Sequence, residues 1–453
     1  MQLIRFTAGN FKSIADEQTI DFAKWPGESS VPDVPWADVV RPVTVLLGAN
    51  ASGKSNMLDA LSYFSRAIRL SATRWQDLED PGEVMFYPFA SETSGVKPSF
   101  FELDFVVDGT RYLYGFEYGS LGVEGEWLHY VPNRRWTTIF ERDVASSTPN
   151  KTFVSEDERA VLRFANPREL YLSVALRGRF GKLGGLAQAI VDSLRFIALS
   201  DQHREQRIHN VMRALRSGGM NFDDVGQLLV AADTGIVHVT LDESKLPPDL
   251  VEKLQTAAAS LKQLHPSPRA GAALTNSDGD GGVIEFSEKD LEAVALHLIF
   301  EHQTEDGTMS LGLREQSDGT VTWFSLATIL VEALKTGGVV VVDELDAHLH
   351  QHLLFLIVEA FTDTTINVGG AQLFFTSHST NLLERMQELN LKEQSFWFTE
   401  KGSDGKTTVY SLADFTKDSR ANYERRYLDG RYRAIPNLSP ATLRGLTNAN
   451  VGG

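Results

Sequence analysis

The sequence predicts an α/β fold, in which a mixed, mainly parallel sheet has an antiparallel β layer beside it and carries an inserted helical arm. Continuous apolar runs at 43–47, 337–343 and 371–376 are typical of strands buried on both faces of a parallel sheet. Alternating apolar and polar residues between 99 and 141 are typical of antiparallel strands. The stretch 200–300 differs in character, with helical periodicity and a segment rich in Pro, Gly, Ser and Ala.

Composition limits the class of protein. A chain of 453 residues is long enough for two or three domains with a large core. The net charge of −17 disfavours indiscriminate binding of nucleic acid but leaves a local basic groove open. The absence of cysteine excludes disulfides, thiol catalysis and zinc–thiolate sites. Because there is no signal-peptide pattern and no apolar run of the ~20 residues that span a bilayer, we expect a cytoplasmic protein without a membrane partner.

The chain alternates strand and helix patterns in order. In the first half we expect strands at 2–10, 18–22, 43–47, 99–107, 111–118, 125–131 and 135–141, a loop at 25–42, helices at 54–70, 156–164 and 183–196, and a strand as an alternative for 195–199. Further on we expect helices at 221–232, 248–264, 321–334 and 349–361, strands at 236–241, 295–301, 309–314, 337–343 and 371–376, and a mobile loop at 265–282.

The segment Gly48–Ser55 reads G-x-x-x-x-G-K-S between an apolar strand and a helix, which is the pattern of a phosphate-binding P-loop. Glycines let backbone N–H groups approach an anion, and the helix start adds a positive dipole end. We expect Lys54 to reach the β- and γ-phosphates and Ser55 to bind Mg²⁺. A chance match in a surface loop is the alternative, against which the strand–loop–helix context argues. The expected nucleotide contacts are Gly48, Ala49, Asn50, Ala51, Ser52, Gly53, Lys54, Ser55 and Asn56.

Two carboxylates, Asp343 and Glu344, follow the apolar run Val339–Val342, which is the Walker B pattern. Ligands bind at the carboxyl ends of strands in open α/β sheets. We therefore expect Asp343 to hold Mg²⁺, directly or through water, and Glu344 to act as general base on the attacking water. A strand that ends in a solvated acidic turn is the alternative.

Histidines follow the same carboxylates. His378 ends the next apolar strand, where it could contact the γ-phosphate and sense its presence; a structural histidine is the alternative. His348, His350 and His352 alternate after the Walker B pair, and a metal site is conceivable there. A helix start with incidental histidines is favoured, because their spacing puts only two of the three on one face.

A short polar segment, Ser317–Thr320, precedes the helix expected at 321–334. Its N–H groups and the Ser317 hydroxyl could bind an anion at the helix N-terminus. A plain helix cap is the alternative, and from this segment alone it is favoured.

Together, the order of these motifs resembles the head of the ABC/SMC class of P-loop ATPases. The resemblance implies that Lys54, Ser55, Asp343, Glu344 and His378 serve ATP and Mg²⁺ in one subunit. It also implies that Ser317 and Gly319 form the signature that completes the ATP site of another subunit, with Asp346 at the D-loop position. The signature Gln316–Thr320 departs from the Leu-Ser-Gly-Gly-Gln of transporters, which argues against a transporter.

A narrower resemblance covers nearly the whole chain, with gaps at 65–95 and 240–290. The opening Ile4–Ile14 with Asn-Phe-Lys-Ser, the P-loop, Glu315–Thr320, Asp343–His350 and the tail Tyr427–Pro436 carry it. They are similar to AAA-type ATPases with an ABC/SMC/OLD-like head from bacterial anti-phage, abortive-infection loci, such as the abortive-infection L-type ATPases and AriA of the PARIS system. The resemblance implies a separate effector, often a Toprim-like or RloB-like nuclease.

The resemblance also suggests the domain organisation. We expect the N-terminal part of the ATPase head, with the P-loop and the antiparallel layer, at 1–199, and a helical insertion or lid at 200–300. The C-terminal part of the head, with signature, Walker B and switch histidine, is expected at 301–400, and an extension at 401–453. The extension is too short for the nuclease domain of OLD proteins, and its stretch Asn422–Arg433 is either a solvated basic helix or an edge that binds a partner or nucleic acid.

The expected function is an ATP-hydrolysing sensor or switch subunit of a bacterial anti-phage defence system of toxin–antitoxin type. It would assemble as a homo-oligomer, a dimer or higher, through shared ATP sites and control a separate toxin or nuclease encoded nearby. The alternative is an SMC- or recombination-repair-like DNA-processing ATPase, which stimulation of hydrolysis by DNA would distinguish. A nuclease in its own right would need a further carboxylate cluster, for which the sequence offers no convincing candidate.

Overall fold

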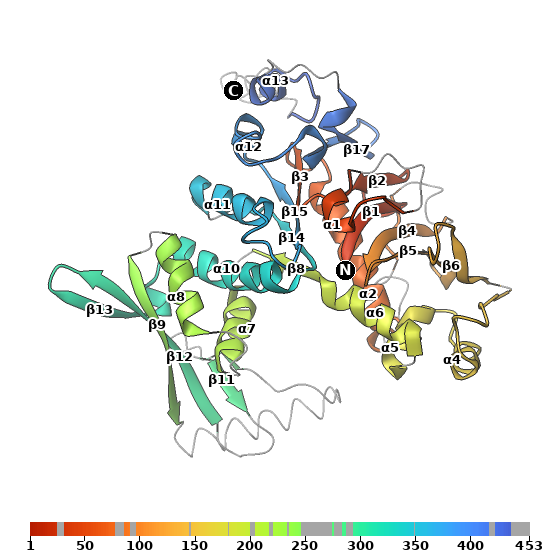
Figure 1. The fold of residues 1–453 in the computed structure, drawn as a ribbon, viewed down its shortest axis with the longest axis horizontal. Coiled ribbons are helices and arrows are strands. Elements are labelled where there is room, and N and C mark those ends of the chain that lie inside the picture. The colour runs from red at the N-terminus through yellow and green to blue at the C-terminus, as the bar shows by residue number, and fades with distance from the viewer. Residues whose placement is uncertain are drawn as a thin grey trace, which may run out of the picture. The chain divides into compact units, whose positions relative to one another are not determined.

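A computed structural model of the chain (Figure 1) divides into two compact units. The first unit comprises residues 1–197, 333–346 and 355–453, and the second comprises 198–332 and 347–354. The residues that the structure describes are 1–24, 31–77, 86–90, 97–144, 146–179, 181–199, 204–216, 221–232, 235–245, 274–275, 283–286, 293–347, 349–415 and 422–435.

A six-stranded central sheet forms the middle of the first unit, in the order β17-β16-β3-β15-β14-β8. Its four inner strands are parallel, because β3 pairs with β15 and β16 and β15 pairs with β14 in parallel register, while β17 pairs antiparallel with β16. The inner strands are mostly buried, as expected for a sheet covered on both faces; β3 and β14 are mainly apolar, whereas β15 and β16 are half polar. The strands are β3 (Val43–Gly48), β8 (Leu194–Ala198), β14 (Val339–Asp343), β15 (Gln372–Ser377), β16 (Phe396–Lys401) and β17 (Thr407–Ser411).

An antiparallel sheet is the second layer of this unit, in the order β2-β1-β4-β5-β6-β7. Asp108 and Gly109 turn between β4 and β5 with positive φ, as a tight hairpin requires. The strands are β1 (Gln2–Gly9), β2 (Gln18–Asp21), β4 (Ser99–Val107), β5 (Thr110–Gly119), β6 (Gly122–Tyr130) and β7 (Thr137–Asp143).

Helix α2 (Lys54–Leu70) joins the two layers of the first unit. Its Phe64 packs against Phe6 of β1 and against Tyr114 and Phe116 of β5, and all of these rings are fully buried. The helix also contacts β3, β14 and β15. The start of α2 is thereby fixed relative to the central sheet. The other helices of this unit are α1 (Trp36–Val39), η1 (Arg74–Asp77), α4 (Glu156–Leu162), α5 (Tyr171–Gly178), α6 (Gly181–Ser193), α12 (Asn381–Glu384), η5 (Glu393–Ser395), η6 (Leu412–Asp414) and α13 (Tyr423–Leu428).

The second unit combines helices with an antiparallel sheet in the order β10-β11-β12-β13, with β9 paired to β12. Its elements are α7 (Arg204–Arg216), α8 (Phe222–Ala231), β9 (Ile236–Lys245), β10 (Leu274–Thr275), β11 (Val283–Phe286), β12 (Ala293–Thr304), β13 (Gly307–Gly312) and η4 (Leu313–Glu315). Helix α10 (Asp318–Thr336) and helix α11 (Gln351–Thr362) each have residues in both units.

The expectation of a helical arm at 200–300 therefore needs correction. The described residues of this stretch form two helices, α7 and α8, and also strands. The longest of these strands, β12, pairs with β9 and β13 along most of its length. The predicted helix 248–264 lies outside the described residues, as does most of the loop expected at 265–282. The segment at 183–196 also needs correction, since helix α6 ends at Ser193 and β8 begins at Leu194.

Other elements lay outside the predictions. Helices α5 and α7 and the β16–β17 hairpin had no predicted counterpart, and α1 forms one turn inside the loop expected at 25–42. In the described part of the chain, no helix combines the length and apolar character needed to cross a membrane.

Candidate nucleotide-binding site

The P-loop connects β3, which ends at Gly48, to α2, which begins at Lys54. Ala51 and Gly53 have φ angles of 61° and 106°. A Cβ atom added at Gly53 would lie 2.2 Å from Oγ1 of Thr407, and one at Gly48 would meet a side chain of β16 at a similar distance. A side chain at either motif glycine would therefore clash with a threonine that lies close to the loop. At Gly53 the positive φ angle also favours glycine.

The side chain of Lys54 folds back into the loop. Its ammonium group donates hydrogen bonds to the carbonyl oxygens of Gly48 at 2.8 Å and Ala49 at 3.1 Å. Burial lowers the pKa of Lys54, while the carboxylates of Glu344, Asp343 and Asp346 act in the opposite direction. The ammonium group is thus within electrostatic reach of the predicted Walker B carboxylates. A lysine that binds the phosphates of a nucleotide must lie in this region.

Hydroxyl groups from distant segments hold the P-loop. Ser52 pairs with Oγ1 of Thr399 at 2.6 Å, and Oγ1 of Thr407 donates to the carbonyl oxygen of Ser52 at 3.0 Å. The Ser13 hydroxyl pairs with Thr407 at 2.7 Å and accepts a hydrogen bond from the amide of Asn56 at 2.6 Å. We call these five residues the hydroxyl clamp; they join the P-loop to β16, to β17 and to the segment that follows β1.

The clamp includes positions to which sequence reasoning assigned no role. Thr399 and Thr407 lie on strands that were not predicted, and both are buried. The side-chain amide of Asn56, a predicted nucleotide contact, donates to the Ser13 hydroxyl. Of the other predicted loop contacts, Asn50 and Ala51 are exposed and Ser55 is half-buried at the start of α2.

The Walker B turn is organised by Thr376, a fully buried residue of β15. Its hydroxyl donates to Oδ1 of Asp343 at 2.5 Å and accepts a hydrogen bond from the backbone N–H of Glu344 at 2.7 Å. Its carbonyl oxygen accepts from the N–H of Leu345 at 3.0 Å. One residue therefore fixes both the orientation of the Asp343 carboxylate and the path of the chain through the turn. The sequence predicts Thr376 only as the last residue of the strand 371–376, with no role in the site.

The turn also brings the predicted general base to the predicted switch residue. Oε1 of Glu344 lies 3.9 Å from Nε2 of His378, and both side chains are partly exposed. The backbone N–H of His378 donates to Oδ2 of Asp346 at 3.1 Å. Glu344 has φ of 52°, an uncommon conformation for a residue with a side chain, which tends to persist where the surroundings enforce it. Glu344, Asp346 and His378 thus form one cluster at the carboxyl ends of β14 and β15.

Oxygen donors suited to Mg²⁺ stand on both sides of this edge. Ser55 lies at the start of α2 and Asp343 at the end of β14. Among the described residues, no three His, Cys, Asp or Glu side chains could hold a metal ion by themselves. Mg²⁺ bound together with a nucleotide takes one or two protein ligands and completes its shell with phosphate oxygens and water.

The predicted signature belongs to the second unit. Oγ of Ser317 accepts a hydrogen bond from the backbone N–H of Thr320 at 3.1 Å and also pairs with the Thr320 hydroxyl at 2.8 Å. Ser317 therefore caps helix α10, as the alternative interpretation expected. Its side chain is exposed, whereas the preceding Gln316 is buried and pairs with His302 at 3.0 Å.

The alternating histidines do not form a metal site within the described residues. The rings of His350 and His352 are 5.1 Å apart and nearly perpendicular, and the backbone N–H of His352 donates to Nδ1 of His350 at 3.3 Å. His348 lies outside the described residues.

In a comparison with known protein families, residues 43–384 match the family model described as "AAA domain, putative AbiEii toxin, Type IV TA system". The matched stretch begins at β3, includes the P-loop and the Walker B turn, and extends beyond His378 to the end of α12. A search of the curated proteins gave no match.

The contact between Gly53 and Thr407 predicts the effect of Gly53→Ala. The added methyl group needs space that Thr407 occupies and a φ angle that alanine rarely adopts, so we expect binding of a fluorescent ATP analogue to weaken at least tenfold. Gly109→Ala is the matched control, since Gly109 also has positive φ but open space around it. It should lose about 1 kcal/mol of stability and bind nucleotide normally. Normal binding by Gly53→Ala would contradict the close-approach argument.

The contacts of Thr376 predict that Thr376→Val destabilises the first unit. Valine has nearly the same shape but can neither accept the hydrogen bond from the N–H of Glu344 nor donate one to Asp343. We expect the free energy of unfolding, measured by urea titration, to fall by about 1–3 kcal/mol. Thr376→Ser keeps the hydroxyl and should restore most of this loss. Equal losses in both variants would mean that packing, and not the hydroxyl group, is what Thr376 contributes.

Proposed function

Because the chain belongs to this AAA family of putative AbiEii toxins of type IV toxin–antitoxin systems, we propose that it is an ATP-hydrolysing sensor or switch subunit of a bacterial anti-phage defence system. The observation that carries the proposal is the cluster at one edge of the central sheet. There a P-loop lysine lies within electrostatic reach of two Walker B carboxylates, and the second carboxylate lies 3.9 Å from His378, the residue that follows β15.

In the proposed reaction, water attacks the γ-phosphate of ATP, the bond to the β-phosphate oxygen breaks, and ADP and phosphate leave. Backbone N–H groups of the P-loop and the ammonium group of Lys54 would bind the phosphates. Ser55 and Asp343 would hold Mg²⁺, which supplies charge neutralisation on the phosphate oxygens when bound. Glu344 would take the proton of the attacking water. Its carboxylate is partly exposed, so water can reach it, and it lies within electrostatic reach of Lys54 in the P-loop.

His378 would report the state of the γ-phosphate. Its ring faces Glu344, and its backbone is tied to Asp346, which follows the Walker B pair by two residues. A change in the contacts of the imidazole ring can therefore shift both the general base and the Asp346 segment. This coupling supports a switch function, in which the presence of the γ-phosphate is transmitted to the surface around Asp346.

We further propose that the ATP site is shared between subunits of a homo-oligomer. Ser317 is exposed at the N-terminus of α10, a helix of 19 residues, and its cap leaves the signature on the surface of the second unit. A phosphate of a nucleotide held by another subunit would suit this helix end. ATP would then hold subunits together, and hydrolysis would release them.

The proposed output is control of a separate effector, a toxin or a nuclease. The description of the family, which pairs an AAA domain with a toxin–antitoxin system, supports a partner protein. Assembly and release of the proposed oligomer would change the surface that such a partner meets. The choice between Toprim-like and RloB-like effectors rests on the resemblance alone.

Glu344→Gln tests the catalytic part of the proposal. The amide keeps the size of the side chain but cannot accept the proton of water, so we expect phosphate release to slow by about 10²–10⁴-fold while ATP binding is retained. Glu359→Gln, at an exposed position on α11, is the control for loss of one negative charge and should hydrolyse at the native rate. Native turnover by Glu344→Gln would remove Glu344 from the mechanism.

The mass in solution of the Glu344→Gln protein tests the shared site. By light scattering after size exclusion, we expect a larger species in the presence of ATP and Mg²⁺ than without nucleotide. Adding Ser317→Arg should abolish this difference, because the long side chain fills the helix end that would receive phosphate. Ser310→Arg, an exposed position on β13 of the same unit, should leave it intact. A mass indifferent to ATP, with binding intact, would exclude shared sites.

A further inference from the structure

A cavity of about 470 Å³ lies in the first unit at the edge of the central sheet opposite the P-loop. Pro42, immediately before β3, Gln372, the first residue of β15, and Ser395, immediately before β16, line it. The P-loop and His378 follow the other ends of these strands. Because β3 has six residues, about 20 Å of strand separates the cavity from the P-loop. Its volume is in the range of small-molecule sites.

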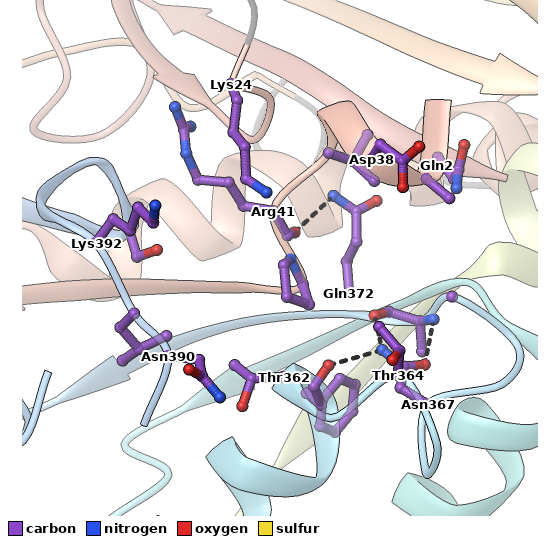
Figure 2. Close-up of a pocket in the computed structure, with 18 of the residues that line it drawn as sticks. Gln2, Lys24, Asp38, Arg41, Thr362, Thr364, Asn367, Gln372, Asn390 and Lys392 are labelled. Atoms are coloured by element: carbon purple, nitrogen blue, oxygen red, sulfur yellow. Dashed lines mark hydrogen bonds between the residues drawn. The ribbon is translucent and has the colours of Figure 1, made fainter. Parts of the chain in front are cut away.

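The cavity is cationic in a chain whose net charge is −17. Lys24, Arg41 and Lys392 line it, and Asp38 is the one carboxylate among its described lining residues. In Figure 2, Asp38 lies on the other side of the view from these three cations. The carboxylates of Glu359 and Asp363 belong to a neighbouring hollow.

Arg41 gives the cavity a buried, preorganised cation. The residue is 7% exposed, and in the described part of the chain its guanidinium makes one hydrogen bond, to the carbonyl oxygen of Asp21 at 2.9 Å, and no ion pair. Its backbone is fixed by the carbonyl of Phe22 and, as Figure 2 shows, by the amide of Gln372 at 3.3 Å. Burial lowers the pKa of Arg41 to about 10, although Asp21 acts against this shift.

A guanidinium has five N–H donors, and leaving most of them without partners in a buried position is costly. An anion with several oxygen atoms would satisfy these donors and offset the burial of the charge. Asn390 and Gln394 also line the cavity, and their side-chain amides have no hydrogen-bond partner among the described residues. They could bind the polar remainder of such a ligand.

We propose that this cavity is a binding site for a small phosphorylated molecule, distinct from the P-loop. Arg41, Lys24 and Lys392 would bind the phosphate group. Lys24 and Lys392 are exposed and make no ion pair in the described part of the chain, so they are free to close on the ligand. The site does not depend on the function proposed above, because none of its residues belongs to the ATP cluster.

Pyrophosphate binding, measured by titration calorimetry, tests the site. The Lys54→Ala protein is the starting variant, since it lacks the lysine that would bind phosphate at the P-loop. We expect this protein to bind pyrophosphate, and Lys24→Gln with Lys392→Gln to weaken that binding at least tenfold. Lys97→Gln with Lys151→Gln removes the same charge from exposed positions outside the cavity and should have no such effect.

The affinity of an Arg41→Lys variant for pyrophosphate is a second test, at the buried position. The variant keeps the positive charge but loses the planar donor geometry, and we expect at least fivefold weaker binding with a cooperative thermal unfolding transition retained. If Lys54→Ala alone abolishes pyrophosphate binding, or if the Lys24 and Lys392 changes leave the affinity unchanged, the proposed site is wrong. Neither result would bear on ATP hydrolysis, which Glu344→Gln tests separately.

Discussion

The hydroxyl clamp is the constraint on which the candidate site depends. A P-loop has no regular hydrogen bonding of its own, so its shape must come from its neighbours. Here Thr399 and Thr407, from the hairpin at the edge of the central sheet, hold the backbone and side chain of Ser52, and Ser13 links the same hairpin to α2. The two motif glycines are needed because these threonines come so close.

A second constraint orders the acidic side of the site. Thr376 joins the ends of β14 and β15 through one hydroxyl, and the turn that it fixes holds Glu344 near His378. Both constraints use buried threonines: the hydroxyls of Thr376 and Thr407 each have two hydrogen-bond partners, and the hydroxyl of Thr399 pairs with Ser52. A buried polar group with complete partners rigidifies its surroundings, whereas an incomplete one would cost stability. Rigid supports are what a loop needs if it is to meet a phosphate without first reorganising.

Local sequence was enough to find the loop and the carboxylates. Gly53, Lys54 and Asp343 stand out because their spacing and the apolar strands before them are contiguous in the chain. Thr399 and Thr407 could not be found in this way, since their partners are hundreds of residues away and a threonine in a strand is ordinary. The β16–β17 hairpin had no predicted counterpart, because the apolar part of β16 is only the three residues Phe396–Phe398. In the second unit the sequence predicts β9 and the β12–β13 hairpin. It does not predict that these strands join in one antiparallel sheet, because helical periodicity in 200–300 favours a helical arm.

The distance in sequence between the P-loop and its clamp has a consequence for synthesis. Ser52 leaves the ribosome long before Thr407, which follows it by 355 residues. Until β17 has been made, the emerging chain contains the whole Gly48–Ser55 motif without the hairpin that gives the loop its shape. Competence to bind nucleotide is therefore acquired only after β17 has been made. Products of premature termination upstream of β17 would carry the motif as an idle segment, unable to compete with intact subunits for ATP.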